Sequence, residues 1–105
     1  MVKRIDKQLS KSIKTYLEKI GEHYHIDAAY VFGSRAKRTH NPESDIDLAI
    51  ISPDIENRIN DRVNMMNLTW RINVDIEPHP YHTTSFNKKE YAVAREILKT
   101  GIKVA

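Results

Sequence analysis

Apolar and polar residues alternate along this chain with two periods, one typical of helices and the other of strands. In residues 5–21 the apolar positions recur at spacings of four and three, which predicts an amphipathic helix with one buried stripe. The members of that stripe are Ile5, Leu9, Ile13, Leu17 and Ile20. Lysines occupy mainly the other side, which we expect to be solvated, and Gly21 marks the expected end of the helix.

Two strands are predicted next, separated by a polar segment. Residues 28–32 form a short apolar run that ends at Gly33, as in a buried strand that leads into a turn. Residues 35–44 are polar, and we expect them to form a helical turn followed by a loop. Residues 45–51 alternate between two aspartates with an alanine and three large aliphatic residues, which predicts a half-buried strand with a polar end.

A second helix follows in the predicted order of elements. Residues 55–70 carry apolar side chains in helical register, and we expect this stripe to lie in the core. Its members are Ile55, Ile59, Val63, Met66 and Trp70. The single tryptophan is therefore expected to be a core residue.

The end of the chain predicts one more strand and one more helix. Residues 72–77 alternate as a strand, and Pro78 and Pro80 should end it, which leaves His79 and His82 in an exposed loop. A last helix is expected over residues 86–99, stopped by a glycine at position 101. Together these elements predict a single α/β (α+β) domain over residues 1–105, a small mixed β-sheet packed with helices.

Composition narrows the possible chemistry. The 105 residues include no cysteine, which excludes disulfide frameworks, cysteine–zinc sites, iron–sulfur clusters and cysteine nucleophiles. No apolar run is long enough to cross a membrane and no targeting segment is visible, so a cytoplasmic location is expected. Lysine and arginine number 17 against 14 acidic residues, a mildly basic balance that fits nucleic-acid binders and many other proteins.

The candidate chemistry lies in the aspartates. Asp45 and Asp47 are two residues apart on a predicted strand, so they share one face with Cα atoms roughly 6.5–7 Å apart. Asp75 can face the same side if its strand pairs with theirs. Three carboxylates suit a hard cation such as Mg²⁺ or Mn²⁺. Upstream, Gly33 would let a phosphate approach the backbone, and the Ser34 hydroxyl could donate to its oxygens.

This set of residues resembles the minimal nucleotidyltransferases of the DNA polymerase beta-like superfamily. The resemblance rests on Gly33-Ser34, on Ser44-Asp45-Ile46-Asp47-Leu48 and on the later Asp75. It implies a polymerase beta palm-like fold in which Asp45 and Asp47 hold two metal ions. It further implies that Asp75 completes one metal site and acts as general base or orients the nucleophile.

The resemblance also implies a nucleotide site. Gly33 and Ser34 would bind the triphosphate, with Arg35 and Ser44 beside it. One departure is Arg38, which stands where many minimal members have glycine. The geometry of residues 37–39 therefore stays open, with either a strained turn or a different turn in which the arginine reaches a phosphate.

The implied activity is transfer of a nucleoside monophosphate, with AMP from ATP expected, to an acceptor hydroxyl with release of pyrophosphate. A chain of 105 residues has little room for an acceptor module, so we expect a partner or a homo-oligomer to supply it. The resemblance implies a helical HEPN-type toxin as partner, with this chain as its antitoxin. One alternative is a non-catalytic subunit that neutralises the toxin by contact. Another, nucleic-acid binding by the lysine-rich first helix, lacks interleaved aromatic residues.

Overall fold

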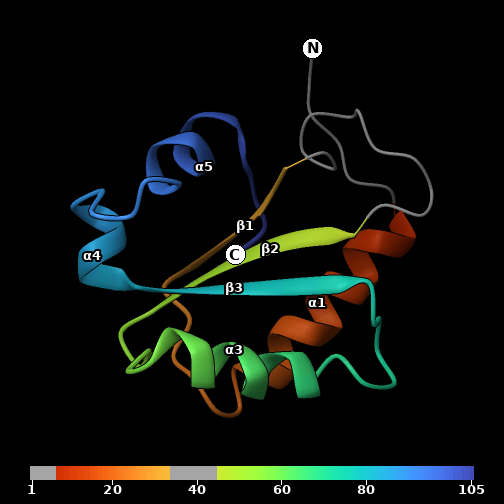
Figure 1. The fold of residues 1–105 in the computed structure, drawn as a ribbon. Helices are drawn as coiled ribbons and strands as arrows, with labels where there is room; N and C mark the ends of the chain where they lie inside the picture. Colours follow the sequence, from red (N-terminus) through yellow and green to blue (C-terminus); the bar gives the residue numbers. More distant parts are fainter. Residues whose placement is uncertain (1–6, 34–44) are drawn as a thin grey trace.

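A computed structural model describes residues 7–33 and 45–105, which form a four-stranded mixed sheet with helices on both faces (Figure 1). The strand order is β3-β2-β1-β4; β2 runs parallel to β3, and β1 is antiparallel to β2 and β4. This confirms the predicted α/β fold. The elements are α1 (Lys7–Ile20), β1 (Ala28–Phe32), β2 (Ile46–Ser52), α3 (Arg58–Asn67), β3 (Ile76–His82), α4 (Thr83–Asn87), α5 (Ala94–Thr100) and β4 (Ile102–Lys103). No helix in these two ranges has the length and hydrophobicity needed to cross a bilayer.

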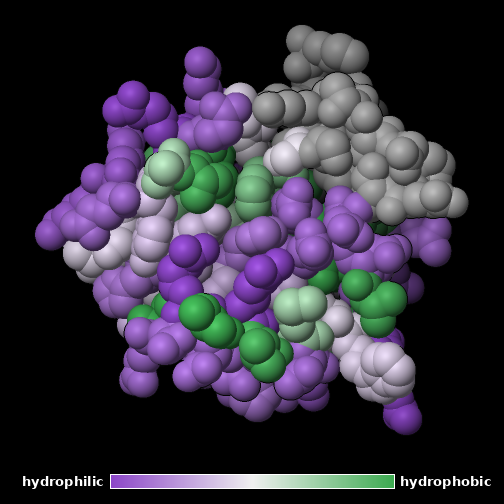
Figure 2. Space-filling view, in the orientation of Figure 1, coloured by the Kyte–Doolittle hydropathy of each residue, from purple (hydrophilic) through white to green (hydrophobic). Residues whose placement is uncertain are grey.

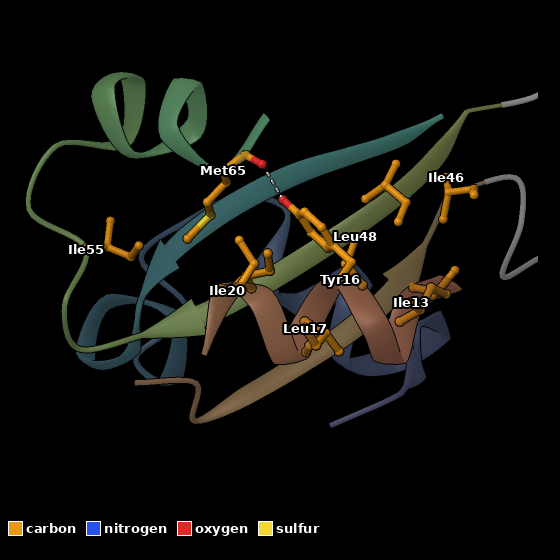
Figure 3. Close-up of a cluster of buried hydrophobic side chains, with 12 residues drawn as sticks. Ile13, Tyr16, Leu17, Ile20, Ile46, Leu48, Ile55 and Met65 are labelled. Carbon is orange, nitrogen blue, oxygen red and sulfur yellow. Dashed lines mark hydrogen bonds between the residues drawn. The ribbon is translucent and has the colours of Figure 1, made fainter. Parts of the chain in front are cut away.

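The larger core lies between the sheet and the first helix. The predicted stripe of α1 packs there, with Ile13, Leu17 and Ile20 buried against the strands (Figure 3). Tyr16, to which the sequence pattern gave no role, is fully buried in the same cluster. Its hydroxyl donates to the carbonyl oxygen of Met65 at 2.7 Å and so ties α1 to α3. This bond satisfies a polar group that would otherwise be buried without a partner.

A second, smaller core covers the opposite face of the sheet. Ala49 and Ile51 of β2 are buried there under Phe86 of α4 and Ile97 of α5. The predicted alternation of residues 45–51 is confirmed, but the expectation of a half-buried strand is wrong. Helices cover both faces of β2, so only the start of the strand retains access to solvent.

The third strand continues through the two prolines that were expected to end it. β3 is an edge strand, and Pro78 and Pro80 lie opposite Leu48 and Ile50 of β2. The carbonyl oxygens of both prolines accept bonds from arginine side chains of α3, so these carbonyls point away from β2. In a strand, the backbone nitrogen and carbonyl of one residue face the same side. The proline nitrogens therefore also point away from β2 and need not donate a hydrogen bond to it. The prediction that the strand spans residues 72–77 is wrong at both ends, because the strand begins at Ile76 after a turn and continues through the prolines to His82.

The orientation of α3 also differs from the prediction. Arg58 Nε donates to the Pro80 oxygen at 2.8 Å, and Arg62 Nε donates to the Pro78 oxygen at 3.2 Å. These bonds turn one side of α3 toward β3, and Met65 becomes its buried apolar residue. The expected core positions Ile59, Val63, Met66 and Trp70 are exposed instead, and only Ile55 of that stripe is buried.

The last predicted helix is divided into two. A break at residues 88–93 separates α4 from α5, and Lys89 within it has a φ of 57°. The imidazole of His82 accepts a bond from the backbone N–H of Thr84 and caps the start of α4. The predicted stop at Gly101 is confirmed, and the chain then adds β4 beside β1.

We expect Tyr16→Phe to lower the free energy of unfolding by about 1–2 kcal/mol, because the Met65 carbonyl loses a buried donor. A domain of this size should then melt roughly 4–8 °C lower for each kcal/mol lost. Thermal unfolding followed by circular dichroism measures the change. Tyr91→Phe is the control, since the ring next to Arg58 is retained. An unchanged melting temperature for Tyr16→Phe would show that the bond adds no stability.

Candidate active site

Three potential metal-binding side chains meet where β2 and β3 begin. The parallel register sets Asp47 opposite Glu77 and Ala49 opposite His79. Because side chains alternate along each strand, Asp47, Glu77 and His79 share one face of the sheet. Each offers one ligand atom, and these atoms all lie within 4.8 Å of one another. All three side chains are partly buried, so the group is neither a solvated strand end nor a closed core.

His79 is held against the aspartate of this group. Its Nε2 lies 3.1 Å from Oδ1 of Asp47, and its ring meets the ring of Phe32 edge-on with centroids 5.1 Å apart. The side chain is 23% exposed, so the expectation that His79 is an exposed loop residue is wrong. An imidazole in this position fixes the orientation of a carboxylate that binds a metal, or adds a nitrogen ligand.

Gly33 follows β1 and lies against the same aspartate. Its φ is +74°, a conformation that residues with side chains rarely adopt. A Cβ atom built on Gly33 would lie 2.5 Å from Oδ2 of Asp47. Glycine is therefore required here by backbone conformation and by the aspartate, in addition to the phosphate approach predicted from the sequence.

Negative charge accumulates around Glu77. Partial burial raises the pKa of its carboxyl most, and the nearby Asp45 and Asp47 carboxylates raise this pKa further. A hydrogen bond with Asp47 adds to the upward shift, and His79 opposes it. Closely spaced carboxylates of this kind are suited to a cation, whose charge would relieve the repulsion at Glu77.

The structure brings together some of the predicted site residues. Asp45 directly precedes β2 and is exposed, close enough to act on the Glu77 carboxyl. Asp75 is exposed in the turn before β3, where its carbonyl oxygen accepts the Ile46 N–H at 2.8 Å. Neither is among the three ligand-bearing residues that converge in the described part of the chain, and their metal and base roles stay predictions. Ser34, Arg35, Arg38 and Ser44 lie outside the described residues.

Glu77 and His79 are the two members of this group that the sequence pattern did not predict as site residues. The alternation of residues 72–77 already placed Glu77 on the same side as Asp75. A strand that ends at Pro78 does not include His79 and has Glu77 as its last residue, so the pattern predicts neither as a site residue. The signal that could have found them is the continued alternation of Glu77, His79 and Tyr81 across the prolines.

The donor set fits a divalent cation. Two carboxylates supply the oxygen ligands that Mg²⁺ and Mn²⁺ prefer, and the imidazole adds a nitrogen donor that transition metals accept. No cysteine competes for a softer metal. These three described residues could therefore hold an ion.

We expect Glu77→Gln to weaken binding of Mn²⁺ by at least about 10-fold, because a charged oxygen ligand is lost and even loss of an outer-shell partner typically costs roughly 10–100-fold. The neighbouring Asp75→Asn removes the same charge two residues earlier and should change the affinity less. Isothermal titration calorimetry with Mn²⁺ measures both. Equal losses for the two variants would restore Asp75 to the metal site, and a loss for Asp75→Asn alone would exclude Glu77.

The raised pKa of Glu77 predicts a dependence of stability on pH. Its charged form is disfavoured in the folded, metal-free protein, so the ionised carboxylate lowers stability above its folded pKa. Glu77→Gln should therefore raise the melting temperature at pH 7 in the presence of a chelator. The gain should vanish near pH 4, since the carboxyl is then largely protonated in both the folded and unfolded states.

Circular dichroism melts at pH 4 and pH 7 check this dependence. Glu18→Gln on the exposed side of α1 is the matched control and should give no pH-dependent difference. If Glu77→Gln raised the melting temperature equally at both values of pH, the stabilisation would not come from removal of the Glu77 charge.

Comparisons with known proteins agree with this geometry. The family model described as "Polymerase beta, Nucleotidyltransferase" matches residues 11–105. A candidate nucleotidyltransferase from Sulfolobus solfataricus, solved by crystallography, has a similar fold with a TM-score of 0.59 at 23% identity. The alignment covers 77% of this chain and 75% of that chain, and this identity supports likeness of fold alone. A search of curated proteins gave no match. The resemblance drawn from the aspartates is thus confirmed: the chain belongs to the polymerase beta nucleotidyltransferase family.

Proposed function

We propose that this protein is a metal-dependent nucleotidyltransferase that moves a nucleoside monophosphate, AMP, from a nucleoside triphosphate to a hydroxyl group on a partner protein. The observation that carries the proposal is the convergence of Asp47, Glu77 and His79 within a nucleotidyltransferase domain. Acidic ligands at this spacing serve phosphoryl and nucleotidyl transfer because the substrate itself is highly anionic.

The reaction balances as an in-line displacement at phosphorus. The acceptor oxygen forms a bond to the α-phosphorus while the bond from that phosphorus to the bridging oxygen of the β-phosphate breaks. Pyrophosphate leaves, and the proton of the hydroxyl passes to a base. Divalent ions at the site, when bound, would neutralise charge on the phosphates.

The residues of the chain would have separate roles in this reaction. Asp47 and Glu77 hold the cation, and His79 orients Asp47 through the 3.1 Å contact. Asp75 and Glu77 are the candidates for the base, since both lie at the start of β3 and a carboxylate can accept the hydroxyl proton. Gly33 leaves the backbone beside Asp47 open to a phosphate group.

A partner protein is proposed as the acceptor because the resemblance drawn from Gly33-Ser34 and the aspartates implies one. Family resemblance favours a helical HEPN-type toxin, with AMP added to a tyrosine and this chain acting as antitoxin. This assignment rests on the resemblance of the aspartate motif and on membership in the family.

The test follows transfer of labelled nucleotide. The protein, its co-purified partner and Mg²⁺ are incubated with ATP labelled at the α-phosphate or, separately, at the γ-phosphate. We expect the α label alone to join the partner, and Asp47→Asn to reduce labelling on the order of 100-fold or more. Glu18→Gln on exposed α1 is the control and should label like the original protein.

Three outcomes would contradict the proposal. Transfer of the γ label would indicate a kinase, and undiminished labelling by Asp47→Asn would remove this residue from the site. Neutralisation of the partner without labelling, unaffected by Asp47→Asn, would favour the contact-only antitoxin.

A further inference from the structure

Two arginines of α3 lie along the outer edge of β3. The Nε atoms of Arg58 and Arg62 donate to two proline carbonyls of that strand, which leaves the terminal N–H groups of both guanidinium groups for other acceptors. Neither arginine forms an ion pair within residues 7–33 and 45–105. Figure 2 shows strongly hydrophilic surface between α3 and β3, next to hydrophobic patches on the outer side of α3. This edge of the sheet therefore presents two positive charges that no carboxylate of the described chain neutralises.

Two tyrosine rings hold Arg58 in place. Its Cζ atom lies 4.6 Å from the centroid of the Tyr81 ring and 5.1 Å from that of Tyr91, and the two ring centroids are 5.0 Å apart. A guanidinium group fixed by stacking and by one hydrogen bond loses little conformational freedom when it binds an anion. Arg58 is nevertheless an exposed residue. It is thus a preorganised positive group that a ligand can reach.

The arginines lie next to the candidate active site. Tyr81 is on the face of β3 that carries Glu77, since side chains alternate along a strand. Burial raises the pKa of the Tyr81 hydroxyl, the charges of Arg58 and Arg62 oppose this rise, and the Asp47 carboxylate adds to it. Both guanidinium groups and the metal-binding aspartate therefore act on one ring, and the arginines continue the site along β3.

The order of the strands indicates what this part of the site would bind. Because β2 lies between β1 and β3, Gly33 at the end of β1 and Glu77 of β3 flank Asp47 on opposite sides. In the proposed reaction, the attacking and leaving oxygens lie in line on opposite sides of the α-phosphorus. With the triphosphate beside Gly33, the acceptor hydroxyl approaches over β3, and the segment that carries it passes the two arginines.

The arginines also restrict the chemistry of the acceptor. Guanidinium groups bind carboxylates through paired, charge-assisted hydrogen bonds. Arg58 and Arg62 are held by carbonyls two residues apart on β3, a rise of roughly 6.6–6.8 Å, and alternate side chains of an extended peptide have the same spacing. A single-stranded nucleic acid would need exposed rings on which its bases stack, whereas Tyr81 is 3% exposed and lies under Arg58. These features favour an acidic peptide.

We propose that Arg58 and Arg62 bind an acidic segment of the acceptor protein, in which carboxylates at alternate positions flank the hydroxyl that receives the nucleotide. Each arginine binds one carboxylate at the outer edge of β3. The inference rests on the proposed nucleotidyl transfer for the direction from which the acceptor approaches. It adds the charge of the acceptor segment, which the group at Asp47 does not specify.

Binding of a synthetic peptide tests the proposal separately from transfer. The probe is a fluorescein-labelled peptide with glutamates at alternate positions before a single tyrosine, and the comparison peptide has glutamines in their place. We expect the acidic peptide to bind the unaltered protein at least about tenfold more tightly, because the comparison peptide loses two charge-assisted pairs. Fluorescence anisotropy measures both affinities, and the difference should shrink as the salt concentration rises.

Substitutions of the arginines test where the peptide binds. Arg58→Gln and Arg62→Gln should each weaken binding of the acidic peptide by about 3–10-fold and leave the affinity for the comparison peptide unchanged. Lys11→Gln is the matched control, since it removes the same charge from an exposed position of α1 on the opposite face of the sheet, and should leave both affinities unchanged. If an arginine variant fails to fold, as circular dichroism would show, the two peptides on the unaltered protein decide.

Several results would overturn the proposal. These are equal affinities for the two peptides, and undiminished binding of the acidic peptide by both arginine variants. Tighter binding of a single-stranded RNA oligonucleotide, lost in the same variants, would assign the arginines to a nucleic acid instead. Transfer of the α label to the partner at an unchanged rate in both variants would leave the proposed function intact and contradict this inference. Arginine-dependent binding of the acidic peptide without transfer would support the inference and contradict the proposed function.

Discussion

Strands β2 and β3 pair in parallel from Ile46 opposite Ile76 to Ser52 opposite His82, and the site and core depend on this register. It sets the apolar side chains of Ile46 and Ile76 together under α1. On the other face it sets Asp47 beside Glu77. A shift of one residue would turn every side chain of one strand to the opposite face, so it would bury a carboxylate and separate the acidic group.

The edge position of β3 explains the most unusual local feature. A strand with neighbours on both sides could not include Pro78 and Pro80, because their nitrogens cannot donate to a ladder. Here Arg58 and Arg62 of α3 donate hydrogen bonds to the outward carbonyls of the two prolines, so α3 supplies the partners that a neighbouring strand would otherwise provide. The rotation of α3 that these bonds require also leaves its apolar stripe in solvent. The contacts between α3 and β3 therefore cover the edge of the sheet and also leave the apolar side of α3 exposed.

The candidate site brings negatively charged side chains together, and their repulsion lowers the stability of the folded protein. Partial burial and the nearby Asp45 and Asp47 carboxylates raise the pKa of Glu77, and Gly33 has a positive φ beside Asp47. A fold selected for stability alone would avoid both features. Their presence where β2 and β3 begin, in a member of the nucleotidyltransferase family, is consistent with a region arranged for cations and phosphates.

The local pattern of apolar and polar residues was sufficient to predict the elements whose two faces differ clearly in polarity. The stripe of α1, the apolar run of β1 and the Asp-x-Asp of β2 each predicted the right element, and the aspartates together with Gly33 predicted the family. The spacing of apolar residues along the chain predicts which side chains share a face, but it does not determine which face becomes buried. Tertiary structure decided that for α3, where two arginines had to bond an edge strand. It also decided the continuation of β3, since prolines are tolerated only where no neighbouring strand needs their N–H, and so it placed Glu77 and His79 beside Asp47.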